Sequence, residues 1–210
     1  MHYAAPPWHD DPMKSVPKYS RLTSEERRAA LEEAALVCMA RGGILEFTID
    51  KVCREAGVSR GLITHHFQTK DGLLAAVYAN MYRKSMAVMN ASRPGMSRIV
   101  AMVEANFSDA VFNRDVLNIW LTLWGEIANN PVLQDEHRRQ YGRYRDDVTN
   151  ALLEAAAGKA VDCDALARQL ICLIDGLGLQ HCIEPALMPP EEAKAACYAL
   201  LAPHLGPLDP

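Results

Sequence analysis

The stretch REAGVSRGLITHHFQTKDGLL, residues 54–74, decides the fold of this chain, because it has the spacing of two short helices joined by a sharp turn. Gly57 stands where the chain must reverse, and glycine adopts the left-handed conformation of such a turn at little cost. Ser59 is placed to cap a helix that we expect over residues 60–67. On that helix Ile63 and Phe67 are four residues apart and share one face. Together these features are typical of a helix-turn-helix.

The flanking sequence predicts the helices that support this motif. Thr23 and Glu26 have the spacing of a capping box, and the helix that follows should end at Gly42 and Gly43. Thr48 should cap the short helix before the turn. Later helices are expected from Lys70 to about Met89 and over about residues 96–111, 114–129, 131–157, 162–183 and 190–202. No strand-like alternation of useful length occurs, so we predict an all-α fold of about nine helices.

Composition divides the 210 residues into three parts. The proline-rich residues 1–20 are expected to form a flexible tail, residues 21–69 the helix-turn-helix domain of three helices, and residues 70–210 a larger helical bundle. No apolar run approaches the ~20 residues that span a bilayer, and the start lacks the apolar middle of a secretory signal. The six cysteines show no CxxC pair, which favours reduced thiols and a cytoplasmic protein. The charge is +3 over residues 18–84 and −6 from residue 85 onward, a contrast too small to identify a partner by itself.

The second helix of the motif leaves its polar side free to meet DNA. A helix fits the major groove of B-DNA, where its side chains reach base edges. Packing through Ile63 and Phe67 leaves five residues facing outward, namely Arg60, Gly61, Thr64, His65 and His66. Lys70 adds a cation beside the backbone amides of the next helix, which already favour phosphate. Since neighbouring residues of a helix point about 100° apart, the two histidines are poor joint ligands of one metal. We therefore expect groove or phosphate contacts here, with no metal and no cofactor.

The longer stretch FTIDKVCREAGVSRGLITHHFQTKDGLLAAV, residues 47–77, resembles the TetR-type bacterial repressors, and its second half is most similar to the BetI branch, which represses choline–betaine synthesis genes. The matching residues are Thr48, Val52, Ala56, Gly57, Val58, Ser59, Gly61, Ile63, His66, Phe67, Lys70 and Leu73. Most members carry tyrosine where this chain has Thr64, so one phosphate contact of the family is altered here. The resemblance implies DNA contacts by Thr48, Lys51, Ser59, Arg60, Gly61, Thr64, His65, His66 and Lys70.

The same resemblance extends to the later segments EANFSDAVFNRDVLNIWLTLWGEIANNPVLQ and RQLICLIDGLGLQ. It implies a homodimer, with an interface at Leu166, Leu170, Leu173, Ile174, Leu177, Gly178 and His181. It also implies a small effector, for which we consider a quaternary ammonium such as choline, held by aromatic rings through cation–π attraction. The hypothetical pocket comprises Glu104, Phe107, Phe112, Trp120, Trp124, Glu126, Tyr141 and Tyr144. Ordinary core packing is the alternative interpretation of this aromatic set.

Other classes of protein fit the sequence less well. The chain has no G-x-S-x-G elbow, P-loop, G-x-G-x-x-G or H-E-x-x-H motif, which argues against the common enzyme classes. A helical ligand carrier or adaptor would leave the polar face of Arg60, Thr64 and His65 without a role. The sequence therefore predicts a ligand-responsive repressor that is not an enzyme and binds a palindromic operator as a dimer.

Overall fold

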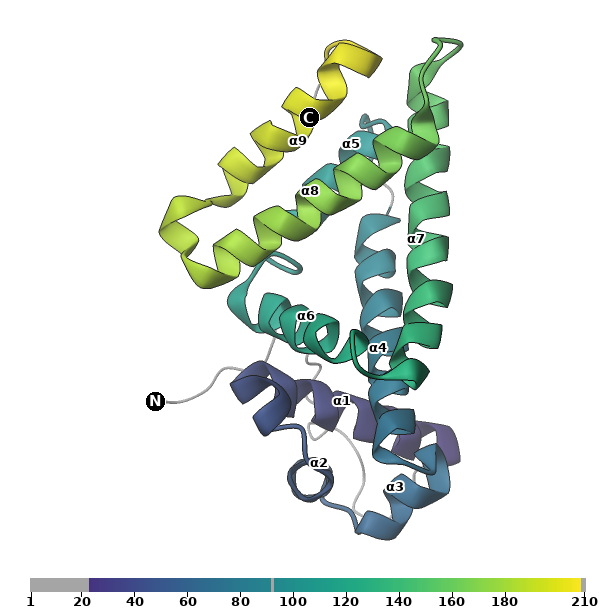
Figure 1. The fold of residues 1–210 in the computed structure, drawn as a ribbon, viewed down its shortest axis with the longest axis vertical. Helices are drawn as coiled ribbons and strands as arrows, with labels where there is room; N and C mark the ends of the chain where they lie inside the picture. The colour runs from purple at the N-terminus through teal and green to yellow at the C-terminus, as the bar shows by residue number, and fades with distance from the viewer. Residues whose placement is uncertain (1–22, 92, 209–210) are drawn as a thin grey trace. The chain divides into compact units, whose positions relative to one another are not determined.

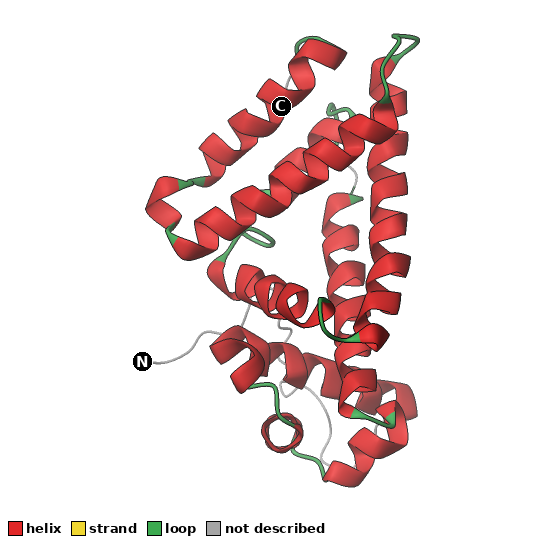
Figure 2. Cartoon of the chain, viewed as in Figure 1, coloured by secondary structure: helices red, strands yellow, loops and turns green. Residues whose placement is uncertain are grey.

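A computed structural model of the chain describes residues 23–91 and 93–208, so the predicted tail of residues 1–20 lies outside the described residues. The described residues form nine α-helices and two single-turn 3-10 helices without any strand (Figure 2). The predicted all-α fold is therefore confirmed. The elements are α1 (Ser24–Gly42), η1 (Gly43–Leu45), α2 (Ile49–Ala56), α3 (Arg60–Phe67), α4 (Lys70–Met89), α5 (Arg98–Asn106), α6 (Arg114–Ile127), α7 (Pro131–Ala156), α8 (Cys163–Ile183), η2 (Pro185–Leu187) and α9 (Pro190–Leu205), as labelled for the α-helices in Figure 1.

These helices belong to two compact units. The first unit contains the described residues up to Asn80 together with Asn118–Glu136. The second contains Met81–Leu117 and the described residues from His137 onward. Three helices, α4, α6 and α7, contribute residues to both units.

The first unit begins with helices whose ends follow from their capping residues. The Thr23 amide donates to Oε2 of Glu26 over 2.7 Å and the Glu26 amide donates to Oγ1 of Thr23 over 3.2 Å, which completes the capping box. Oγ1 of Thr48 accepts the Lys51 amide at the start of α2. Gly57 ends α2 with φ 67° and ψ 32°, a left-handed geometry that lets α3 turn away from α2. The predicted limits of α1, α2 and α3 are thus confirmed.

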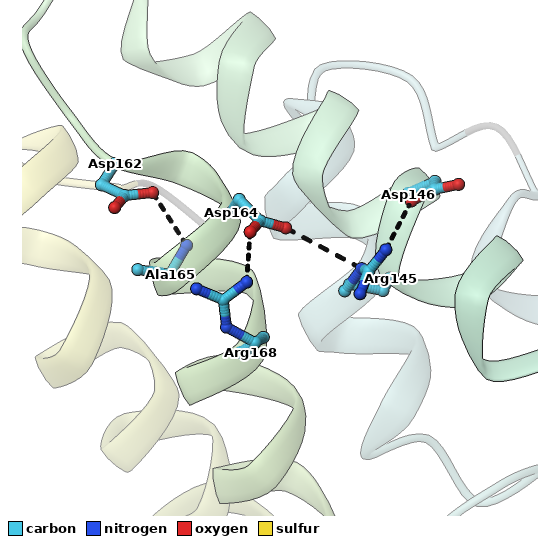
Figure 3. A network of polar contacts seen from close by, with 6 residues as sticks. All are labelled: Arg145, Asp146, Asp162, Asp164, Ala165 and Arg168. Atoms are coloured by element: carbon cyan, nitrogen blue, oxygen red, sulfur yellow. Dashed lines mark hydrogen bonds and ion pairs between the residues drawn. The ribbon is translucent and has the colours of Figure 1, made fainter. Parts of the chain in front are cut away.

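Charged side chains of α7 and α8 lie close to one another in the second unit (Figure 3). Asp162 caps α8 by accepting the Ala165 amide over 3.0 Å. One turn into α8, Asp164 pairs with Arg168 of the same helix and approaches Nε of Arg145 on α7 to 3.8 Å. This contact joins the first turn of α8 to α7, and because both side chains are partly exposed it contributes little to stability.

Two helices end elsewhere than the sequence indicates. The segment expected over 96–111 is helical only to Asn106. The side-chain amide of Asn106 donates to the Met102 carbonyl, and the Ser108 hydroxyl donates to the Ala105 carbonyl. Such side-chain contacts offer the backbone an alternative to continued helix. Helix α9 instead continues past Pro203 to Leu205, so that proline lies in the last turn. None of the described helices is both long and apolar enough to cross a bilayer.

Candidate nucleic-acid interface

Helix α3 is seated on the first unit by its apolar side. Ile63 is 3% exposed and Phe67 is 5% exposed, as their four-residue spacing predicted. Arg28 of α1 holds the end of α3, since its Nη1 donates to the carbonyl oxygen of His66 over 2.8 Å and its guanidinium carbon lies 4.5 Å from the centre of the Phe67 ring. No local pattern predicts this role of Arg28, because it depends on the contact between α1 and α3.

The opposite side of α3 faces away from the unit. Arg60, Gly61, Thr64 and His65 are all exposed. Ser59 is also exposed and stands at the start of the helix. Its side chain makes no capping hydrogen bond, so its hydroxyl is available to a binding partner. The polar side of α3 therefore has the geometry of a surface that lies along a partner.

His66 differs from the other polar residues of α3 because it is half-buried. Its ring packs edge-on against that of His65 with the two centres 4.8 Å apart, and its Nε2 is enclosed without a hydrogen-bond partner among the described residues. Burial, followed by the positive charges of His65 and Arg28, lowers the pKa of His66. The neutral ring thus braces α3. Within the described ranges, no three His, Cys, Asp or Glu side chains are grouped so that they could hold a metal ion.

Two cations of the motif, Arg60 on α3 and Lys51 on α2, are paired with carboxylates of the same unit. Arg60 contacts Asp50 in the first turn of α2. Lys51 donates to Oε1 of Glu46 over 2.6 Å and to the Leu45 carbonyl over 3.2 Å. These two partners were not anticipated from the sequence, since each depends on the geometry of a turn.

The remaining predicted phosphate contacts lie at the starts of α2 and α4. Thr48 is exposed, and although its oxygen accepts the Lys51 amide, its O–H remains available as a donor. Lys70 is exposed with its ammonium nitrogen 5.4 Å from the centre of the Phe47 ring. Both helix starts therefore present donors on the surface of the first unit.

The residues of the hypothetical effector pocket divide between the two units. In the first unit, the rings of Trp120 and Trp124 stack with centres 5.9 Å apart, Tyr78 meets Trp120 edge-on at the same separation, and Glu126 is half-buried. Trp120 is 9% exposed, so this cluster contributes to the core of its unit.

In the second unit, Phe107 and Phe112 are buried with ring centres 5.0 Å apart, and Phe112 also packs on His181 at 4.3 Å. Tyr141 is half-buried and Tyr144 is buried.

Glu104, which we considered as a counter-charge in that pocket, already has partners. It accepts from the Tyr198 hydroxyl over 2.7 Å, and its Oε2 lies 3.0 Å from Nζ of Lys194. Burial alone would raise the pKa of Glu104, but the hydrogen bonds from Tyr198 and Lys194 and the charge of Lys194 outweigh burial and lower it. Its charge is balanced within the chain.

The residues of the predicted dimer interface are largely covered by their own chain. Leu166, Leu170, Leu177 and Gly178 are buried, while Leu173, Ile174 and His181 are half-buried. A Cβ on Gly178 would meet Leu117 at 3.1 Å, so that glycine permits a close approach within the second unit. The residues of α8 that remain exposed at helical spacing are Cys172, Gly176, Leu179 and Ile183, which we call the α8 stripe.

Comparison with known proteins identifies relatives of both parts of the chain. Residues 31–77 match the family model for bacterial regulatory proteins of the tetR family, and residues 95–206 match the model for the C-terminal part of BetI-type transcriptional repressors. The HTH-type transcriptional regulator BetI of Burkholderia thailandensis is 33% identical over 181 residues, which cover 82% of this chain and 88% of that protein.

Solved structures agree with this relationship. A putative transcriptional regulator from Pseudomonas aeruginosa PAO1 superposes with a TM-score of 0.73 and 33% identity, covering 89% of this chain and 93% of the other. A putative regulator from Saccharomonospora viridis in complex with choline has the same fold, with a TM-score of 0.69, 24% identity, and coverage of 84% of this chain and 96% of its own.

Proposed function

We propose, from the premise that this chain belongs to the TetR family of bacterial transcriptional regulators and carries a BetI-type C-terminal part, that it represses transcription as a homodimer on a palindromic operator. A small organic cation would release it from DNA. The exposed polar side of α3 carries the first part of this proposal, because that side offers donors and acceptors at the spacing of a recognition helix. A regulator of this kind would act in the cytoplasm, where bacterial DNA lies.

The proposed contacts fall into two classes. Arg60, Thr64 and His65 would meet base edges in the major groove, with Gly61 letting the backbone come near and His66 holding the helix in place. The hydroxyls and ammonium groups at the helix starts would bind phosphates, through Thr48, Lys51, Ser59 and Lys70. Such phosphate contacts release counterions, so affinity should fall steeply as salt rises.

A dimer would supply the second recognition helix that a palindrome requires. The α8 stripe supports this arrangement, since Leu179 is 38% exposed and Ile183 is 66% exposed on a helix whose leucines Leu166, Leu170 and Leu177 are buried. Helix α9 lies beside α8 (Figure 1) and adds exposed small residues at Ala195, Ala199 and Ala202. Small residues allow helices of two subunits to approach closely.

Our proposal of a choline-class effector rests on the similarity of this chain to its relatives and not on a described pocket. The chain is similar to BetI regulators, and a more distant neighbour binds choline in its crystal structure. Helix α4 is continuous from Lys70 to Met89 and contributes to both units, so it would link effector binding in the second unit to α3. Release requires only that the effector prefer one arrangement of the helices over another.

Substitution of single cations separates base reading from phosphate binding. We expect Arg60→Ala to weaken operator binding about 10–100-fold and to relax sequence choice at one base pair of each half-site. Lys70→Ala should weaken operator and unrelated DNA by about the same factor and lower the salt dependence by about one counterion per subunit. Fluorescence anisotropy on both duplexes at several salt concentrations measures this. If neither substitution changes DNA binding, α3 is not the recognition helix.

A further inference from the structure

The short helix α3 needs other helices to fix its direction. It has only eight residues, and isolated helices shorter than about 12–15 residues are marginally stable in water. Ile63 and Phe67 attach its apolar side to the first unit. The last carbonyl groups of any helix, however, have no partners within that helix. The direction of α3 therefore depends on what contacts its end.

The chain leaves α3 through a strained turn. Gln68 has φ 65° and ψ −52°, and the Thr69 amide donates to the Phe67 carbonyl over 2.7 Å. This is the rare form of the γ-turn, which persists only where the surrounding structure imposes it. Helix α4 imposes it from one side, because a Cβ on Gly72 would lie 2.1 Å from the Phe67 carbonyl oxygen and only glycine allows this approach.

Arg28 of α1 contacts both of the residues that precede this turn. Its Nη1 donates to the carbonyl oxygen of His66 over 2.8 Å, and its guanidinium carbon lies 4.5 Å from the centre of the Phe67 ring. Its Nε lies 3.2 Å from Oε1 of Glu32, one turn further along α1, and the Glu32 side chain is only 8% exposed. A planar guanidinium can make these three contacts at once, whereas the ammonium of lysine is a point charge that cannot.

Two other roles of Arg28 fit these contacts less well. Its side chain is 44% exposed, which would allow a phosphate contact, but two of its nitrogens already serve Glu32 and the His66 carbonyl. A role in the stability of α1 would need only the pair with Glu32, four residues away. The contacts with His66 and Phe67 reach a different helix, so they bear on the placement of α3.

We propose that Arg28 is a positioning residue of the DNA-binding surface: held by Glu32, it fixes the end of α3 and thereby sets the selectivity for operator sequence without itself binding DNA. This inference rests on the proposed role of α3 in reading DNA. Base contacts depend on the exact direction of α3, whereas contacts with phosphates carry no sequence information. Loss of the Arg28 contacts should therefore reduce specific binding and spare non-specific binding.

Binding of the full-length protein to two duplexes tests this assignment. One is the duplex that selection from random DNA enriches, and the other has the same bases in scrambled order. Arg28→Lys keeps the charge, and we expect it to weaken binding to the enriched duplex at least about 10-fold while changing binding to the scrambled duplex less than about twofold. A loss of folded protein would weaken both equally, so the ratio of the two affinities reports the position of α3.

Two further variants separate positioning from phosphate binding. Arg28→Gln removes the charge and should give a similar loss of selectivity with an unchanged salt dependence. Arg27→Lys is the matched control on the same helix and should change neither affinity. Equal losses on both duplexes in Arg28→Lys would overturn the assignment. A salt dependence lowered by about one counterion per subunit in Arg28→Gln would also overturn it, because Arg28 would then bind a phosphate.

Amide hydrogen exchange of the protein without DNA tests the same contacts independently. In Arg28→Lys the amides from Thr64 to Thr69 should exchange at least about fivefold faster, while those of α8 should be unchanged. Unchanged exchange at the end of α3 would contradict the proposal. Failure of the proposed regulator function would appear separately, as the absence of any enriched duplex with the parent protein, and the exchange experiment would then still decide whether Arg28 holds α3.

Discussion

The guanidinium of Arg60 stands at the start of α3 in contact with the carboxylate of Asp50 in α2. Both side chains are exposed, at 71% and 52%, so water screens the pair and it stabilises the fold by at most about 1 kcal/mol. To make the base contact that we propose, Arg60 would have to leave this carboxylate. If Arg60 binds DNA as we propose, Asp50 would compete with DNA for Arg60, and its own charge would repel phosphate.

We predict that Asp50→Asn strengthens DNA binding. Removing the competitor and its negative charge should lower the dissociation constant about 3–10-fold at moderate salt, with a smaller gain at high salt. Anisotropy titrations at two salt concentrations measure the change. Glu25→Gln is the matched control, because it removes an exposed carboxylate from the first turn of α1. Equal or weaker binding by Asp50→Asn would show that the pair prepares Arg60 for DNA instead of competing with it.

At the scale of the elements, the sequence predicted most where local chemistry sets a helix end. Thr23, Thr48 and Gly57 give α1 and α2 the limits that the structure shows. The predicted end of α5 was wrong: the helix stops at Asn106, and the backbone then turns, with the Ser108 amide donating to the Ala105 carbonyl and the Val111 amide to the Ser108 carbonyl.

The candidate site was predictable to the same extent. The exposed polar side of α3 follows from periodicity, whereas the roles of Asp50 and Arg28 depend on contacts between helices that no local pattern encodes.

The turn between α2 and α3 gives a prediction at this scale. Nothing lies within 4 Å of a Cβ placed on Gly57, so a substitution there costs only backbone strain at φ 67°. Gly57→Ala should destabilise the protein by about 1–2 kcal/mol, while Gly57→Asn should cost less, because asparagine tolerates left-handed geometry. Thermal unfolding and operator binding measure both. If alanine and asparagine are equally tolerated, the left-handed turn does not limit the placement of α3.

For the whole molecule, the proposed homodimer raises the question of which surface would join two subunits. The leucines that the sequence placed at the interface, Leu166 and Leu170, are 2% and 1% exposed within one chain. Periodicity showed that α8 has an apolar side, but it did not show which residues the chain itself covers. The α8 stripe is what remains for a partner.

Ile183→Glu tests this surface. A carboxylate buried between two subunits would lack a partner, so the dimer should dissociate at least about tenfold more readily, and operator affinity should fall with it. Sedimentation velocity at micromolar concentration measures the change. Leu153→Glu is the control, since Leu153 is 56% exposed and belongs to α7 instead of α8. Dissociation by the control alone would move the interface to α7.

Selection of bound duplexes from random DNA by the full-length protein tests the central claim, that α3 reads DNA in a symmetric pair. We predict enrichment of a palindrome whose half-sites are centred about 10 base pairs apart, or a multiple of that spacing. Recovery of a single unpaired motif, or no enrichment over the starting pool, would contradict it.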